Sequence, residues 1–268
     1  MQAYLESAQL LAAYSGGRDL ESLTRGDIED FLADQLSRHR ATTAAGRYRN
    51  LQQFYRWVVE EGLVEVSPTA GLRPPTVPET PVPVLDEAAI NRLLGTMTGR
   101  GFEDRRDTAI VRLFLDTGMR LSEVAGLQLT DVDLDADVAL VLGKGHRPRA
   151  CPFGDKTGQA IERYLRERNK HARAKGPELW LGARGVLTGN GITQMLRRRA
   201  KQAGIDHLHP HMFRHTFAHR WLSEGGQEQD LMRLAGWRSR EMLSRYGASA
   251  ADQRAREAHK RLGLGDRV

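Results

Sequence analysis

The sequence lacks the features that would place the protein outside a reducing compartment or in a membrane. Its 268 residues contain one cysteine, Cys151, which excludes an internal disulfide. Cys151 lies in an apolar run, so we expect a small buried side chain rather than a reactive thiol. No stretch approaches the apolar length of a membrane span, and the N-terminus lacks the basic-then-apolar pattern of a secretory signal. These absences predict a cytoplasmic protein.

Neither sign of charge dominates, and no internal repeat is present. The chain carries 40 Lys and Arg against 34 Asp and Glu, a formal net charge of +6 with a pI ≈ 9.7. This balance permits a polyanionic partner without requiring one. Hydrophobic residues make up 40% of the chain, which is enough for a proper core, and the length suits one large domain or two smaller ones.

Proline is scarce except in one segment, which we interpret as a domain boundary. Half of the 10 prolines lie between Arg73 and Pro83. Such a run forms an extended, semi-rigid spacer and is incompatible with a helix or a central strand. We therefore expect a helical first domain over residues 1–73, a linker over 74–83 and a larger second domain over 84–268.

Helical periodicity dominates both predicted domains. In the first, Thr24 is an expected N-cap with Asp27 three residues later, and the helix that follows places Leu36 among its inner residues. In the second, Asp86 is an expected N-cap and Gly118 an expected helix end.

Residues 131–153 depart from the helical pattern. Val138 to Leu142, and later Arg149 to Phe153, predict short strands. Between them the sequence GKGHR predicts a turn with Lys144 at its tip. The expected fold class is therefore mainly α with a small β-sheet.

Six residues could carry chemistry, although each is a weak signal alone. An arginine beside a helix start is often an ordinary surface residue, a lysine on a glycine-flanked turn is usually solvated, and a single tryptophan or tyrosine is usually core. An H-x-x-R spacing only places two side chains on one helical face. The order and spacing of the six are more informative. They are Arg120, Lys144, His211, Arg214, Trp237 and Tyr246.

In that order and in their local frames, the six resemble the signature of the tyrosine recombinases, the phage integrase family. The frames are TGMRLSEV at Thr117–Val124, HMFRHT at His211–Thr216 and LAGW at Leu234–Trp237, followed by Tyr246. The resemblance covers nearly the whole chain. It implies a helical core-binding (SAM-like) domain followed by an α+β catalytic domain. Many members have histidine where this chain has Trp237, and some active members have tryptophan.

The resemblance implies a site-specific recombinase that cleaves and rejoins DNA without ATP, a metal or another cofactor. Tyr246 would form a 3′-phosphotyrosyl link that stores the energy of the broken bond. Lys144 would be the general acid that protonates the leaving 5′-oxygen. His211 would accept a proton or donate a hydrogen bond to the phosphate.

The other three of the six residues can stabilise a pentacoordinate phosphorus, which carries extra negative charge on its non-bridging oxygens. Arg120 and Arg214 can each hold such oxygens bidentately and stay charged at any working pH. Trp237 can add an indole N–H and a wall that keeps the tyrosine in place. We expect Glu123 and His215 to orient the two arginines.

A metal site is the competing interpretation of the histidine-rich stretch. His211, His215 and His219 recur at helical spacing, which zinc sites use. However, residue 212 is methionine, so the H-E-x-x-H pattern is absent, and neither a carboxylate nor a cysteine stands nearby as a further ligand. We therefore expect no metal.

Two basic clusters are candidates for DNA contact outside the site. Such residues would mostly contact phosphates, which confers affinity and salt dependence rather than sequence choice. A solvated helix face is the alternative for several of them. The candidates are Arg38, Arg40, Thr42, Thr43, Arg47, Arg49 and Arg56 in the first domain and Arg197, Arg198, Arg199 and Lys201 in the second.

The resemblance also implies an assembly of four protomers on two DNA duplexes, with strand exchange through a Holliday intermediate. The expected last helix, 250–261, would dock on a neighbouring protomer or fold back on its own domain. We expect no further N-terminal module for accessory DNA sites, which favours a simple recombinase. Two alternatives stay open. One is an accessory protein that binds a DNA site without cutting it. The other is a type IB topoisomerase, although the compact core-binding domain argues against it.

Overall fold

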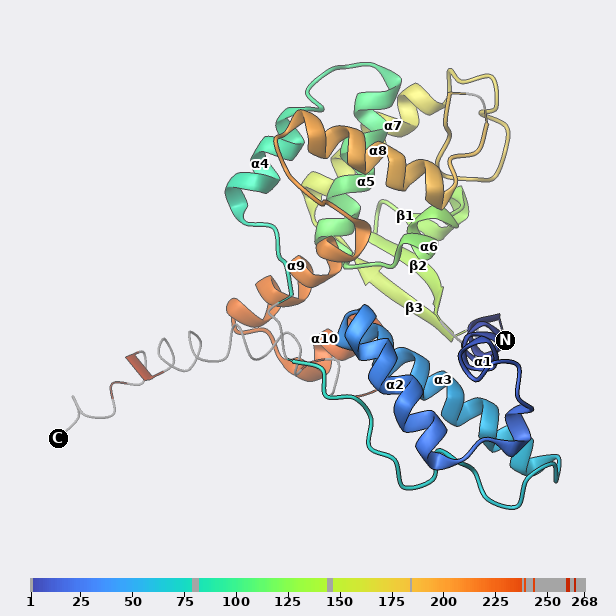
Figure 1. Cartoon of the computed structure of the whole chain (residues 1–268). Coiled ribbons are helices and arrows are strands. Elements are labelled where there is room, and N and C mark those ends of the chain that lie inside the picture. Colours follow the sequence, from blue (N-terminus) through green and yellow to red (C-terminus); the bar gives the residue numbers. More distant parts are fainter. Residues whose placement is uncertain are drawn as a thin grey trace. The chain divides into compact units, whose positions relative to one another are not determined.

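The computed structural model describes residues 2–78, 82–143, 147–183 and 185–237, together with 239, 243, 259–260 and 263. The chain divides into two compact units, Met1–Thr80 and Pro81–Val268. In Figure 1 the labels α1, α2 and α3 mark helices of the first unit, and the second unit contains both helices and strands. The assignment of these units as core-binding and catalytic domains stays a prediction.

The first unit consists of helices α1 (Gln2–Tyr14), α2 (Arg25–Arg38) and α3 (Ala41–Glu60), with a 3-10 turn at Leu20–Ser22. Their apolar faces enclose a core to which all three helices contribute. Its fully buried members include Leu11, Ile28, Phe31, Leu51 and Tyr55.

Helix α2 begins where the sequence predicted. The Thr24 hydroxyl accepts a hydrogen bond from the Asp27 amide at 3.4 Å, and the Asp27 carboxylate accepts one from the Thr24 amide at 2.7 Å. The expectation for Leu36 is wrong, because its side chain is 43% exposed. The buried stripe of α2 is Ile28, Phe31, Leu32 and Gln35, and the next residue is rotated about 100° away from it.

The second unit contains seven α-helices among its described residues, a 3-10 turn at Leu129–Asp131 and a small sheet. The helices are α4 (Glu87–Gly95), α5 (Phe102–Thr117), α6 (Leu121–Ala125), α7 (Asp155–Arg168), α8 (Gly189–Gln202), α9 (Pro210–Ser223) and α10 (Glu228–Ala235). Strands β1 (Val132–Asp133), β2 (Val138–Gly143) and β3 (Arg147–Pro152) pair antiparallel in the order β1-β2-β3. The expected fold class, mainly α with a small β-sheet, is confirmed.

Helix α5 is the central element of the second unit and packs against α7 and α9 (Figure 1). Its residues Ile110 and Phe114 are completely buried, and the Phe114 ring stacks on Phe213 of α9 at a centroid distance of 5.4 Å. A smaller apolar cluster joins the second half of α9 to α10 and includes Phe217 and Trp237. These contacts fix the C-terminal end of α5 beside α9 and α10.

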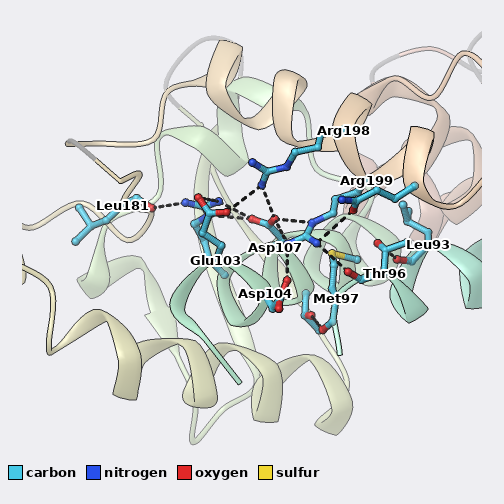
Figure 2. Close-up of polar contacts among 12 residues, drawn as sticks. Leu93, Thr96, Met97, Glu103, Asp104, Asp107, Leu181, Arg198 and Arg199 are labelled. Carbon is cyan, nitrogen blue, oxygen red and sulfur yellow. Dashed lines mark hydrogen bonds and ion pairs between the residues drawn. The ribbon is translucent and has the colours of Figure 1, made fainter. Parts of the chain in front are cut away.

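A buried charge network fixes the other end of α5 to α8. The Asp107 carboxylate is 0% exposed and accepts hydrogen bonds from Arg106 at 2.7 Å and from Arg199 at 2.8 Å. Arg199 also binds Asp104 at 2.6 Å and the Thr96 carbonyl at 2.8 Å. Figure 2 shows Arg198 and Arg199 converging on Asp107. Arg199, a member of the second basic cluster, is therefore buried, and its guanidinium links α8 to α5.

Within the described part of the chain, every helix is too short or too polar to cross a lipid bilayer.

Candidate functional site

The first part of the site is the sharp turn between α5 and α6, which positions Arg120. Gly118 ends α5 with a left-handed φ of +56°. A Cβ atom at this position would lie 2.5 Å from the Phe217 ring, so both the backbone conformation and the space demand glycine. Two residues later, Arg120 precedes the first turn of α6 with 38% of its side chain exposed.

Glu123 holds Arg120 in place. Its carboxylate accepts hydrogen bonds from the Arg120 amide at 2.7 Å and from the Arg120 Nη1 at 2.9 Å. Burial alone would raise the pKa of Glu123, but hydrogen bonds from Arg149 and from the Arg120 amide outweigh it and lower the pKa to about 2. Glu123 is therefore ionised throughout the working pH range, as an anchor for Arg120 requires.

Arg149 is a partner of Glu123 that the sequence analysis missed. Its Nη1 and Nη2 bind the two Glu123 oxygens at 2.7 and 2.9 Å, and its Nε donates to the Leu234 carbonyl of α10 at 2.9 Å. One signal could have found it. Cys151 was expected to be buried, and Arg149 lies two residues before it on the same strand and therefore on the same face.

The second guanidinium, that of Arg214 on α9, is 1% exposed. Its Nη1 donates to the Gly118 carbonyl at 2.7 Å and its Nη2 to the Ala235 carbonyl at 2.5 Å. The guanidinium carbon lies 5.2 Å from the ring centroid of Trp237, a cation–π contact. Arg214 thus links two parts of the fold, namely the turn that carries Arg120 and the end of α10.

Two histidines lie on the same helix as Arg214. The rings of His211 and His215 meet edge to face at a centroid distance of 4.7 Å. Desolvation and then the positive charges of Arg214, His209 and Arg120 lower the pKa of His211. A neutral imidazole at pH 7 can accept a proton.

The structure brings six of the eight predicted catalytic and orienting residues into one neighbourhood. Lys144 and Tyr246 lie outside the described residues, and so does most of the expected helix 250–261. The roles of all eight stay predictions. The six that lie together are Arg120, Glu123, His211, Arg214, His215 and Trp237.

The histidine-rich stretch was also considered as a metal site. Among the residues that the structure places, no three His, Cys, Asp or Glu side chains come together as candidate ligands.

The predicted DNA contacts of the first unit extend from the last turn of α2 along α3, as far as Arg56 near the end of α3. Arg38 lies in the last turn of α2 and pairs with Asp34 at 2.7 Å. Arg47 is partly buried. The remaining candidates are exposed and comprise Arg40, Thr42, Thr43, Arg49 and Arg56.

The candidates of the second unit lie on α8. Arg197, Arg198 and Lys201 are exposed there. Arg198 also has partners within the protein, because its Nη2 donates to Asp107 at 3.3 Å and to Glu103 at 3.4 Å. No finding tests the DNA contacts of either unit, and they stay predictions.

The chain is similar to known proteins in both sequence and fold. The sequence model of the phage integrase family matches residues 83–253. Tyrosine recombinase XerC of Corynebacterium efficiens is 32% identical over 90% of this chain and 78% of its own length. Among solved structures, XerA recombinase has a TM-score of 0.60 at 25% identity and matches 98% of this chain and 91% of its own.

The Tn1549 transposon integrase, solved in complex with transposon right end DNA, has a TM-score of 0.75 at 19% identity, with 98% of this chain and 93% of its own covered. That likeness concerns the fold. The family match and the curated relative decide the assignment, and they confirm the site-specific recombinase expected from the sequence. The chain belongs to the phage integrase family, that of the tyrosine recombinases.

Proposed function

We propose that this tyrosine recombinase breaks and rejoins double-stranded DNA at a specific site through a 3′-phosphotyrosyl intermediate on Tyr246, without ATP or metal. The observation that carries the proposal is the pair of fixed guanidiniums, Arg120 and Arg214, joined through the Gly118 turn. A neutral His211 lies within electrostatic reach of both. This combination suits a phosphodiester that gains negative charge in the transition state.

The proposed reaction conserves bonds and protons. The Tyr246 oxygen attacks phosphorus and forms one P–O bond as the bond to the 5′-oxygen breaks. His211 accepts the phenol proton, and Lys144 donates a proton to the leaving 5′-oxygen. Attack by a 5′-hydroxyl reverses these steps and rejoins the strand, so no external energy source is required.

The arginines stabilise the pentacoordinate state because their positive charge is in place before the reaction begins. Arg214 is oriented by the backbone carbonyls of Gly118 and Ala235. Arg120 and Arg149 share the single negative charge of Glu123. The group of Arg120, Arg149 and Glu123 therefore keeps excess positive charge, which can stabilise the non-bridging oxygens.

Double-stranded DNA as the substrate is supported by the structural neighbour that was solved on transposon end DNA. We further propose that four protomers assemble on two duplexes and exchange strands through a Holliday intermediate. The exposed arginines around the α2–α3 turn and on α8 would contact phosphates. A cytoplasmic site of action fits the single cysteine.

The experiment uses duplexes from the DNA that flanks the gene. Each duplex carries a nick, so that cleavage releases the fragment whose 5′-hydroxyl would otherwise rejoin the strand. Wild type and Tyr246→Phe are compared on a denaturing gel. We expect a DNA-linked protein band with wild type alone. Salt-sensitive binding of a DNA site without any covalent band would indicate an accessory protein. Relaxation of supercoiled DNA that lacks any special site would indicate a topoisomerase.

A further inference from the structure

The two guanidiniums of the site depend on different parts of the fold. Arg120 is held at the start of α6 through Glu123. Arg214 is held at the end of α10 through the Ala235 carbonyl. A phosphate bound by both arginines therefore requires these two elements to keep a fixed separation. A shift of about 1 Å between catalytic groups can cost a rate factor of about 100.

We propose that Arg149 is a positioning residue that couples Arg120 to the end of α10 and so sets the spacing of the two phosphate-binding arginines. The proposal rests on the proposed function, since it concerns the same site. Arg149 itself contacts no phosphate in this account. Its role is to hold Glu123 on one side and the backbone of α10 on the other.

The contacts of Arg149 use the whole guanidinium fork. Nη1 and Nη2 bind both oxygens of Glu123 at 2.7 and 2.9 Å, and Nε binds the Leu234 carbonyl at 2.9 Å. Leu234 directly precedes Ala235, the carbonyl of which holds Arg214. One planar side chain thus links the anchor of Arg120 to the anchor of Arg214.

The surroundings of Arg149 also fit a positioning role. Its side chain is only 11% exposed, so it offers little surface to a ligand. Gly236 makes room for it, because a Cβ atom there would lie 3.3 Å from the Arg149 Nη1, and its φ of +65° also favours glycine. The glycine that follows α10 therefore leaves the space that this guanidinium occupies.

Arginine is required by the geometry of these contacts. Lysine has one nitrogen and cannot bind both Glu123 oxygens in a plane while also reaching the Leu234 carbonyl. Removing Arg149 would also leave the Glu123 side chain, which is 6% exposed, without its bidentate partner. The pKa of Glu123 should then rise, because burial opposes ionisation and the main hydrogen bonds that offset it are lost.

A purely structural role would predict something different. If Arg149 only stabilised the fold, its variants would melt at lower temperature but would cleave DNA normally below the melting range. A positioning role predicts a slower cleavage step in a folded protein. It also predicts a new loss of rate at acidic pH, since protonated Glu123 holds Arg120 less well.

The test measures single-turnover cleavage of a nicked site at saturating protein from pH 5 to 9. It compares wild type, Arg149→Ala, Arg149→Lys and the control Arg163→Ala, which alters an exposed arginine on α7. We expect Arg149→Ala to cleave about 100-fold more slowly, with DNA affinity unchanged and a new acidic limb. Arg149→Lys should fall between Arg149→Ala and wild type, and Arg163→Ala should match wild type.

Chemical rescue sharpens the test. Millimolar guanidinium ion should restore part of the rate of Arg149→Ala, because the vacated space beside Glu123 fits it. Arg149→Leu fills that space and should not respond. Normal cleavage by a folded Arg149→Ala with the pH profile of wild type would overturn the proposal. If Arg149→Ala does not fold, Arg149→Lys decides by the same criteria.

A second readout separates this proposal from the proposed function. Orthovanadate, a tetrahedral phosphate analogue that can accept a fifth oxygen ligand, is titrated into each protein by calorimetry without DNA. We expect Arg149→Ala to weaken its binding as Arg120→Ala does. If wild type binds orthovanadate in this way but cleaves no DNA, the proposed function fails and the coupling stands. Equal orthovanadate affinity in wild type and Arg149→Ala would contradict the coupling.

Discussion

At the scale of single residues, the two guanidiniums of the site are held by different kinds of acceptor. Arg214 donates hydrogen bonds to the backbone carbonyls of Gly118 and Ala235, which orient it. Arg120 is bound by a carboxylate that also neutralises part of the charge of Arg149. Arg214 is buried and preorganised, whereas Arg120 remains partly exposed and able to meet an entering strand.

Replacing Arg120 tests whether its charge acts on the transition state. We expect Arg120→Ala to slow cleavage by about 100- to 1,000-fold, the loss typical of one oxyanion-stabilising group. DNA affinity should change little, because many other phosphate contacts remain. Cleavage is measured at saturating protein and affinity by titration. An equal loss of affinity would mean that Arg120 only anchors DNA.

Arg197→Ala is the matched control and should show the opposite pattern. Arg197 is exposed on α8, outside the arginine site. Its loss should weaken binding and reduce the slope of log affinity against log salt by about 1, while the saturated cleavage rate is kept.

The lowered pKa of His211 makes stability depend on pH. In the unfolded chain this imidazole takes up a proton near its ordinary pKa of 6.5, whereas in the folded protein it does so only at lower pH. Its neutral form therefore contributes stability above pH 6.5, and that contribution is lost as the pH falls. The melting temperature of wild type should fall more between pH 8 and 5.5 than that of His211→Gln. Equal falls would contradict the lowered pKa.

At the scale of secondary-structure elements, α5 is fixed at both ends. The Asp107 network binds it to α8, and the Gly118 turn binds it to α9 through Arg214. A rotation of α5 would disturb both the core and the site. The buried charges at one end therefore support the geometry of the arginines at the other.

The Asp107 network predicts a large loss of stability for Arg199→Met. This change leaves a fully buried carboxylate with Arg106 as its main partner. We expect a loss of about 3 kcal/mol in the free energy of unfolding, at the low end for breaking a buried pair because Arg106 remains. Urea denaturation measures it.

Arg197→Met on the exposed face of the same helix is the control and should change stability by less than about 0.5 kcal/mol. If the two variants unfold at the same urea concentration, the buried network contributes nothing measurable to stability.

The boundaries of the elements were largely predictable, because they depend on local signals. A few adjacent residues determine each of three boundaries, which are the Thr24 cap, the Asp86 cap and the Gly118 helix end. The structure contains all three. The buried pairs Asp107–Arg199 and Glu123–Arg149 were not predictable, because each joins segments far apart in the chain. Arg199 resembled its exposed neighbours in sequence, and the partner of Glu123 lay on a strand 26 residues away.

At the scale of the whole molecule, DNA affinity should come from both units. Arg40 and Arg49 are exposed near the start of α3. We expect Arg40→Ala combined with Arg49→Ala to reduce the slope of log affinity against log salt by about 2, since each phosphate contact contributes about 0.9. The saturated cleavage rate should be unchanged. An unaltered slope would exclude these two arginines from the DNA interface.

The central claim is that a tyrosine of this chain becomes covalently linked to DNA at a site built from Arg120 and Arg214. The most direct measurement isolates the covalent complex formed on a nicked site, digests the protein and the DNA, and identifies the nucleotide-bearing peptide by mass spectrometry. We predict a 3′-phosphonucleotide on Tyr246 of the wild-type protein, formed equally well in excess EDTA. An adduct on another residue, or one that forms only with a divalent metal, would contradict the account.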